Sequence, residues 1–324
     1  MAGVAESAAE FDAQSHRTGI ALEPSALGPI LEVPLLRDQH AADLLAKLRE
    51  GEPSPYGTGR WRCFPVAELH ETADAGLWAS GRGGRELWKG GSFDQFEPHG
   101  ADVRPIPASD AVLAKARKKR PGGGSLLAED LTVAERAAVV AREIERPRVA
   151  FRDVTNRTNA RTLLAALVPP GTFLTNKAPY LAFTDDRPSD RMACLALMNS
   201  LPFDWQARRF VETNVNFFIL EGLRLPELSD ETYDRLAELA GRLSCVDDRY
   251  ADFAASLGVE HGPLAPEERE RMRVEIDALA ATAWRLTADE LELVLSDFTL
   301  DAVPEAYRER LRAHHAELAE RALA

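Results

Sequence analysis

The chain has few cysteines and no long apolar run. These two absences argue against a disulfide-rich or zinc-binding protein and against a membrane-spanning one. Its 324 residues include three cysteines, Cys63, Cys194 and Cys245, and no two of them have the Cys-x-x-Cys spacing of a zinc or redox pair. We therefore expect buried free thiols rather than a disulfide framework or a zinc site. No segment approaches the roughly 20 apolar residues that a membrane-spanning helix needs. Residues 1–14 are small and acidic, not basic and then apolar, so we expect no export signal and a cytoplasmic location.

The sequence motifs typical of catalytic sites and cofactor-binding sites are also missing. Seven histidines are scattered along the chain, without a Gly-x-Ser-x-Gly motif or a Cys/His arrangement. Asp94, Asp102, Asp153 and Asp185-Asp186 do not have the spacing of a nuclease metal site. The glycine-rich runs 81–84 and 122–124 do not join an apolar strand to a helix, as a phosphate-binding loop does. We expect no catalytic, cofactor or metal site on this chain. Whether the chain has an enzymatic activity of its own stays open, and the sequence favours that it has none.

A basic surplus is confined to the middle of the chain, although the net charge is −13. Residues 81–224 contain 22 Lys or Arg and 17 Asp or Glu, whereas residues 225–324 contain 11 and 23. Residues 1–80 are acidic as well, with 6 against 12. Binding to nucleic acid depends largely on neutralising phosphates. This distribution fits a module that offers DNA one face and offers solvent or protein the others.

The pattern of apolar and turn-forming residues predicts an α+β fold. Residues 1–27 have no apolar periodicity and are expected to form a flexible tail. A mixed-sheet region should follow at 28–227, and apolar residues at three- and four-residue steps predict a mainly helical region at 228–324. Within it, Thr287-Ala-Asp-Glu290 has the spacing of a helix capping box. The other predicted elements are a strand at 30–36, a helix at 39–49, short strands and turns at 60–100, a strand at 148–154, a short helix or strand at 159–167, and helices at 192–199 and 203–214.

Two groups of basic and amide residues could contact nucleic acid. Lys115 to Arg120 places five charges in six positions beside flexible glycines, which suits a loop that follows a DNA backbone, although a merely solvated loop is the alternative. In residues 152–161, Arg and Asn side chains offer the bidentate groups that recognise guanine and adenine edges. The alternative there is structural, with Arg152 paired to Asp153 and with Asn156 and Asn159 capping turns.

Several of these segments resemble one protein family. The segments are Trp88–Phe96, Arg148–Pro170, Ala196–Ser200, Asp204–Phe210 and Leu223–Glu227, within a resemblance that covers about residues 30–300. They resemble the target-recognition region of large adenine-specific DNA methyltransferases of the type IIG restriction-modification and phage-defence kind. The Asn/Asp-Pro-Pro-Tyr/Phe tetrapeptide with which such enzymes hold the extruded adenine is absent. The chain therefore resembles a specificity module without its catalytic half.

The resemblance implies sequence-specific recognition of double-stranded DNA on behalf of an adenine-N6 methyltransferase. S-adenosylmethionine would then be bound by a partner, the methyltransferase catalytic subunit or domain, and no cofactor by this chain. Two alternatives remain open, a protein-interaction subunit of a defence complex and a remnant of a split methyltransferase gene. The recognition sequence and the partner's identity do not follow from the sequence. The candidate DNA contacts are Lys89, Gln95, Lys115, Arg117, Lys118, Lys119, Arg120, Arg152, Arg157, Asn159, Arg161, Arg208 and Arg209.

Overall fold

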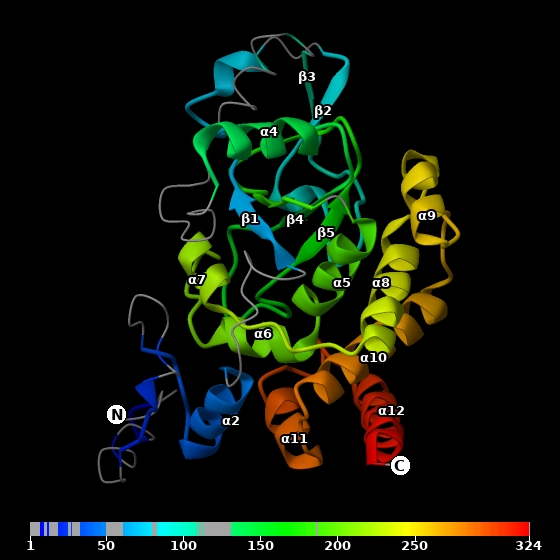
Figure 1. The fold of residues 1–324 in the computed structure, drawn as a ribbon. Helices are drawn as coiled ribbons and strands as arrows, with labels where there is room; N and C mark the ends of the chain where they lie inside the picture. Colours follow the sequence, from blue (N-terminus) through cyan, green and yellow to red (C-terminus); the bar gives the residue numbers. More distant parts are fainter. Residues whose placement is uncertain are drawn as a thin grey trace.

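The computed structural model confirms the α+β class. It describes residues 7–9, 12, 19–24, 27, 33–49, 61–79, 83–107, 109, 112, 131–185 and 187–323. These residues form two β-sheets and ten α-helices. Figure 1 shows the sheets in the upper part of the molecule, with α8 and α9 along one side and α6, α11 and α12 at the lower end.

The larger sheet has four short strands in the order β1-β7-β4-β5, and neighbouring strands are antiparallel. These strands are β1 (Cys63–Val66), β7 (Tyr180–Phe183), β4 (Arg148–Phe151) and β5 (Ala165–Val168). β4 occupies the first half of the strand expected at 148–154, and β5 resolves the open choice at 159–167 in favour of a strand. Every residue of the four strands is buried, which explains why their sequences are almost continuously apolar.

A smaller mixed sheet has the order β3-β2-β6. Its central strand β2 (Arg85–Trp88) is antiparallel to β3 (Arg104–Ile106) and parallel to the two-residue β6 (Phe173–Leu174). Short 3₁₀ turns at Ala75–Leu77 and Gly90–Ser92 lie between these elements, so the expectation of strands and turns at 60–100 is confirmed.

Alternate residues of the larger sheet belong to two different hydrophobic clusters. Val149, Phe151 and Leu181 pack with the helices α5 and α8 in the main core. Ala150, Tyr180 and Ala182 point the other way, toward Trp88 of the smaller sheet and Val140 of α4. The larger sheet is therefore the middle layer of three, as the two-residue period of a strand requires.

Helices make up most of the remainder, and their periodic segments are found where the apolar pattern placed them. α2 matches the expected helix at 39–49, and the region after residue 228 is helical as predicted. The helices are α2 (Gln39–Arg49), α4 (Val133–Glu143), α5 (Pro188–Met198), α6 (Leu201–Arg208), α7 (Phe217–Gly222), α8 (Asp230–Ser244), α9 (Ala251–Leu257), α10 (Pro266–Ala283), α11 (Ala288–Ser296) and α12 (Glu305–Leu323), with a 3₁₀ turn at Asp248–Tyr250 before α9.

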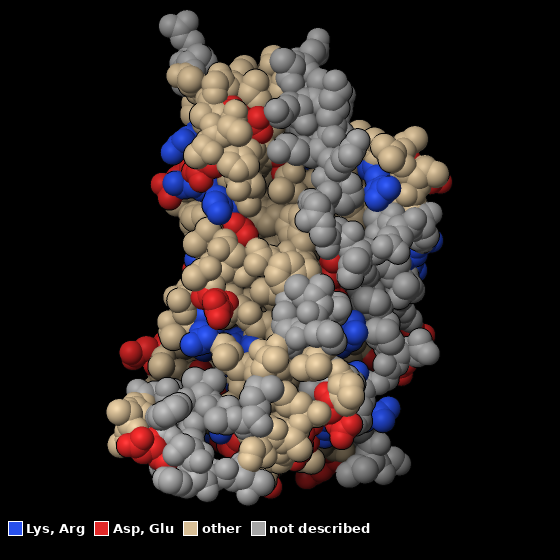
Figure 2. Space-filling view, turned by 90° about the vertical axis from the view of Figure 1, so that its left-hand side faces the viewer, with Lys and Arg blue, Asp and Glu red and all other residues tan. Residues whose placement is uncertain are grey.

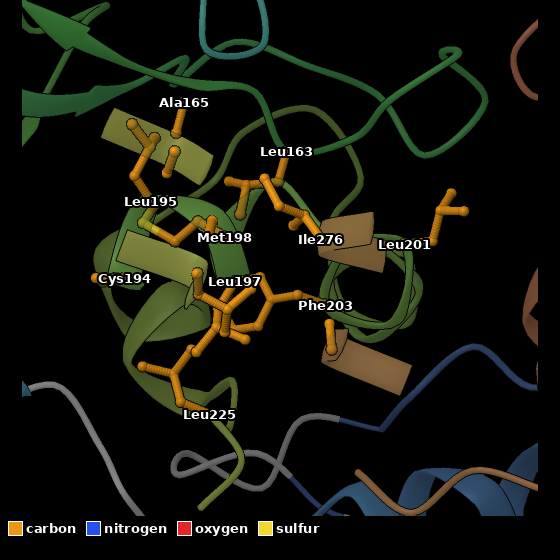
Figure 3. Packing of buried hydrophobic residues seen from close by; sticks show 14 of the residues in the cluster. Leu163, Ala165, Cys194, Leu195, Leu197, Met198, Leu201, Phe203, Leu225 and Ile276 are labelled. Atoms are coloured by element: carbon orange, nitrogen blue, oxygen red, sulfur yellow. The ribbon is translucent and has the colours of Figure 1, made fainter. Parts of the chain in front are cut away.

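One hydrophobic core extends on both sides of residue 227. The main cluster includes residues of α2 and β4 together with residues of α8, α10, α11 and α12. Figure 3 shows Ile276 of α10 in the same group as Ala165 of β5 and Met198 of α5. The sheet region and the helical region therefore share their apolar interior.

Two predicted elements differ from the structure. Of the strand expected at 30–36, residues 30–32 lie outside the described residues, and residues 33–36 are not a strand. Among the described residues, the Leu35 N–H donates to the carbonyl of Arg209 and no strand ladder forms there. The helix expected at 203–214 ends at Arg208. Beyond it the chain turns to pair with another segment, because the Val215 N–H donates to the Asp153 carbonyl at 2.8 Å.

The three cysteines are buried free thiols, as expected. In the part of the chain that the structure describes, no helix combines the length and apolar character needed to cross a membrane.

The capping box of α11 also joins this helix to α2. The Thr287 hydroxyl accepts a hydrogen bond from the Glu290 N–H, and the Glu290 carboxylate accepts one from the Thr287 N–H. Lys47 of α2 pairs with the same carboxylate at 2.5 Å. Burial alone would raise the pKa of Glu290, but the hydrogen bonds from Lys47 and Thr287 outweigh it and lower that pKa.

Replacing Glu290 with glutamine should therefore weaken the fold in a pH-dependent way. At neutral pH we expect a loss of roughly 0.5–1 kcal/mol in the free energy of unfolding, because glutamine keeps the capping hydrogen bond but removes the charge that pairs with Lys47. A depressed carboxylate pKa stabilises the folded state above the unfolded pKa of about 4.3 and is lost as the pH falls through the folded value. Urea denaturation of both proteins should show a difference that is full above about pH 5 and shrinks toward pH 3. A difference that stays constant across this range would contradict the assignment.

Candidate nucleic-acid interface

Two neighbouring chain segments carry a group of exposed side chains, most of which are uncharged and polar. Residues 154–160 follow β4, and residues 212–216 follow α6; together we call them the Asn/Thr ridge. Val154 and Asn214 form an antiparallel bridge, and the Thr155 N–H donates to the Thr213 carbonyl at 3.1 Å. The exposed members are Val154, Asn156, Thr158, Asn159, Ala160, Glu212, Thr213 and Asn216.

Hydrogen bonds within the ridge fix the turn at its tip. Asn156 Oδ1 accepts from both the N–H and the hydroxyl of Thr158, each at 2.9 Å. The Asn159 N–H donates to the Asn156 carbonyl at 3.0 Å, and Asn159 Nδ2 reaches the Thr155 hydroxyl at 3.4 Å. The alternative in which Asn156 caps a turn is thus confirmed, whereas the Oδ1 atom of Asn159 accepts no hydrogen bond from the described part of the chain. Asn159 keeps most of its bonding capacity for an external group.

Arg208 holds the ridge from beneath. Its side chain is 7% exposed, and its guanidinium donates to three carbonyls of the ridge. The bonds are Nη1 to Arg157 O at 2.9 Å and Nη2 to Asn159 O at 2.8 Å and Ala160 O at 3.0 Å. A fourth carbonyl, that of Asp297, accepts from Nη1 at 3.1 Å. The fork geometry of arginine makes this multiple anchoring possible.

The charge of Arg208 is balanced by the buried Asp204, one turn earlier on α6. Arg208 Nε donates to Asp204 Oδ1 at 3.2 Å, and both carboxylate oxygens accept from the Thr162 N–H. Burial lowers the pKa of Arg208, and the Asp204 carboxylate partly restores it. Asp204 also lies 3.9 Å from Arg161, which donates to the Asn199 carbonyl.

Arg209 faces away from solvent as well. It is 6% exposed, stacks over the Trp205 ring at 4.4 Å, and donates to the carbonyls of Trp205 and Leu35. Its Nη2 forms an ion pair with Asp297. The sequence places Arg208 and Arg209 on a helix surface, and the structure corrects this, because neither guanidinium has an open face for phosphate in this conformation. Their contacts favour a scaffold role.

Arg152 likewise organises a neighbouring loop. Its Nε donates to the Gly90 carbonyl at 2.8 Å and its Nη2 to the Phe93 carbonyl at 2.7 Å. The alternative pairing with Asp153 is wrong, since Asp153 pairs with Lys177 at 3.0 Å. Gly90 is required here, because a Cβ at this position would lie 2.7 Å from the Lys177 carbonyl oxygen. Gly90 therefore permits close packing of this loop against the backbone at Lys177.

The remaining candidates differ in accessibility. Gln95 is buried, and its Nε2 donates to the Asn199 carbonyl at 2.5 Å. Lys89 is 30% exposed and pairs with Asp102 at 3.4 Å. Arg157 is half-buried, and its guanidinium has no hydrogen-bond or ion-pair partner in the described part of the chain. Lys115, Arg117, Lys118, Lys119 and Arg120 lie outside the described residues.

Charge is dispersed over the face shown in Figure 2. Uncharged residues cover most of its described surface, and Lys or Arg side chains lie in small groups next to Asp or Glu. In the described part of the chain, no three His, Cys, Asp or Glu residues are grouped so that they could hold a metal ion. The chemistry that the site offers is hydrogen bonding by the amide and hydroxyl groups of the Asn/Thr ridge.

Sequence reasoning missed half of the ridge. The run Thr213-Asn214-Val215-Asn216 repeats the threonine and asparagine content of residues 155–159 and could have suggested a second polar segment. It also missed Arg37, which is 54% exposed and lies 3.9 Å from Asp297. No local pattern connects Arg37 to a partner 260 positions away.

The chain was compared with known proteins and structures. No family model matches it, and no curated protein matches it. Among solved structures it is similar to the type IIL restriction-modification enzyme MmeI in complex with DNA, at 10% sequence identity and a TM-score of 0.36. The similarity covers 80% of this chain and 35% of that enzyme's chain. At this level the likeness supports no statement about activity, and the chain spans about a third of the enzyme it matches.

Proposed function

We propose that this chain recognises a specific sequence in duplex DNA for an adenine-N6 methyltransferase of a restriction-modification or phage-defence system. The partner methyltransferase would hold S-adenosylmethionine and the target adenine, and this chain would hold the surrounding DNA. The methyltransferase assignment depends on the sequence resemblance. A cytoplasmic location is part of the same proposal, since such a protein meets its substrate there.

The Asn/Thr ridge is the observation that carries the proposal. The major groove of B-DNA admits a two-stranded ribbon, and the ridge consists of two bridged segments. Asparagine can make paired hydrogen bonds with the major-groove edge of adenine, and Asn159 has the free acceptor and donor that this requires. Because Arg208 fixes the ridge backbone, little conformational entropy would be lost on binding.

Selection of bound sequences from a random duplex pool tests the proposal. We expect the purified chain, alone or with a partner methyltransferase, to enrich one motif that contains adenine. Asn159→Ala should lower discrimination at one base pair by roughly 5- to 150-fold, the equivalent of about 1–3 kcal/mol for a bidentate base contact. Ser256→Ala removes an exposed hydroxyl on α9 and serves as the matched control. No enrichment under either condition would refute DNA recognition.

A protein-interaction role is the second candidate, and the acidic helical region favours it. Residues 225–324 contain 23 acidic and 11 basic residues, and Glu231, Asp234 and Glu238 are exposed together on α8. Such a surface repels DNA and suits a basic protein partner. Co-purification with a methyltransferase after complete nuclease digestion, combined with no motif enrichment, would support this role over DNA recognition.

A further inference from the structure

Five arginines gather beneath and beside the Asn/Thr ridge. Arg208 donates to the backbone of Arg157, and Arg161 lies 3.9 Å from the carboxylate that Arg208 contacts. Arg209 and Arg37 both pair with Asp297. The cluster consists of Arg37, Arg157, Arg161, Arg208 and Arg209.

The carboxylates that contact this cluster offset part of its charge. Asp204 pairs with Arg208, Asp297 with Arg209, and Asp277 lies 3.9 Å from Arg161. These three carboxylates lie within 4 Å of Arg37, Arg161, Arg208 and Arg209. Burial first, and then the like charges of Arg37 and Arg208, lower the pKa of Arg209 to about 9, with a smaller contribution from Arg157. The like charges of Arg37, Arg208 and Arg157 therefore act on Arg209 despite the carboxylates nearby.

The buried and the accessible arginines of the cluster differ in what they can bind. Arg208 and Arg209 are buried and use their donors on protein carbonyls. Arg157 is half-buried without a side-chain partner in the described residues, and Arg37 is 54% exposed. The planar fork of a guanidinium matches two oxygens of a phosphate. An anion bound by Arg157 and Arg37 would reduce the repulsion among the guanidinium groups of the cluster.

We propose that Arg157, assisted by Arg37, binds one phosphate of the DNA backbone. This deepens the proposed function and depends on it for the source of the phosphate. Arg157 lies within the ridge between Asn156 and Thr158, so a phosphate held there sets the position of the ridge in the groove. Arg157 is a positioning residue for recognition and carries no base specificity.

Salt-dependent binding tests this site. We would measure the affinity of the full chain for a random-sequence duplex of about 20 base pairs by fluorescence anisotropy across a range of NaCl concentrations. The slope of log K against log[NaCl] is negative, and each lost phosphate contact should reduce its magnitude by about 0.9. We expect this change in Arg157→Gln, together with about a tenfold lower affinity at one salt concentration. Arg157→Lys should restore part of the slope, and Arg271→Gln on the exposed face of α10 should leave it unchanged.

Other outcomes separate this site from the proposed function. If the wild-type chain binds DNA but Arg157→Gln has the wild-type slope, the phosphate site is overturned and DNA recognition stands. If the wild-type chain binds no DNA, the proposed function fails and the site is judged with inorganic pyrophosphate. Pyrophosphate should then raise the Tm of the wild-type chain more than that of Arg37→Gln/Arg157→Gln at equal ionic strength. An equal shift in both proteins would overturn the site.

Discussion

Replacing Arg208 with methionine is expected to lower the free energy of unfolding by about 3–5 kcal/mol, the cost of removing one partner from a buried ion pair. The substitution leaves the buried Asp204 without its hydrogen-bonded cation and removes the donor to four main-chain carbonyls. Urea denaturation followed by circular dichroism gives the measurement. A loss of this size is at least about a fifth of the roughly 5–15 kcal/mol that stabilises a typical domain, and it approaches the whole of that stability at the lower end of the range.

Two comparison variants make the result interpretable. Arg208→Lys keeps the charge but loses the fork, so we expect a smaller loss and a less ordered ridge. Arg271→Met makes the same substitution at an exposed position of α10 and should change stability by less than about 0.5 kcal/mol. If Arg208→Met were as stable as Arg271→Met, the anchoring role of Arg208 would be wrong.

Deleting residues 228–324 should abolish folding of the remainder. α5 packs against α8, and the main core draws side chains from α8, α10, α11 and α12. Each large apolar side chain that is exposed costs about 1.5–3 kcal/mol, so the loss of a few such contacts exceeds the stability of a typical domain. Differential scanning calorimetry of fragment 1–227 should show no cooperative transition.

A nicked chain provides the control for this deletion. A protease site inserted at residues 259–264, between α9 and α10, would cut the backbone without removing any helix. We expect the two fragments to stay together through size-exclusion chromatography and to unfold in one transition. A cooperative transition in fragment 1–227 alone would instead show that the sheet region is an independent domain.

Local patterns predicted the elements whose formation depends on local interactions. The helix at 39–49, the helices beyond residue 228 and the capping box at Thr287 follow from apolar periodicity and short-range hydrogen bonds. The burial of the cysteines follows from their apolar chemistry. The α+β class could be predicted from the order in which helix and strand patterns follow one another along the chain.

Features that depend on distant partners were not predictable in this way. Arg208 and Arg209 end a short helix, a place where basic residues are usually solvated, and their burial depends on Asp297, nearly 90 positions away. The segment 33–36 has the apolar content of a strand, yet Leu35 exchanges its hydrogen bonds with Arg209 and not with a neighbouring strand. β6 has two residues and is defined by its parallel pairing with β2, which no local pattern shows.

The anchoring of the Asn/Thr ridge has a consequence for how the protein can change. Arg208 contacts the carbonyl oxygens of Arg157, Asn159 and Ala160, which every amino acid possesses. The side chains at these positions can therefore be exchanged while the backbone that displays them keeps its support. Positions 159 and 160 can therefore carry side chains of different chemistry without a compensating change in the interior, so the base preference of this surface can change where the fold places little constraint.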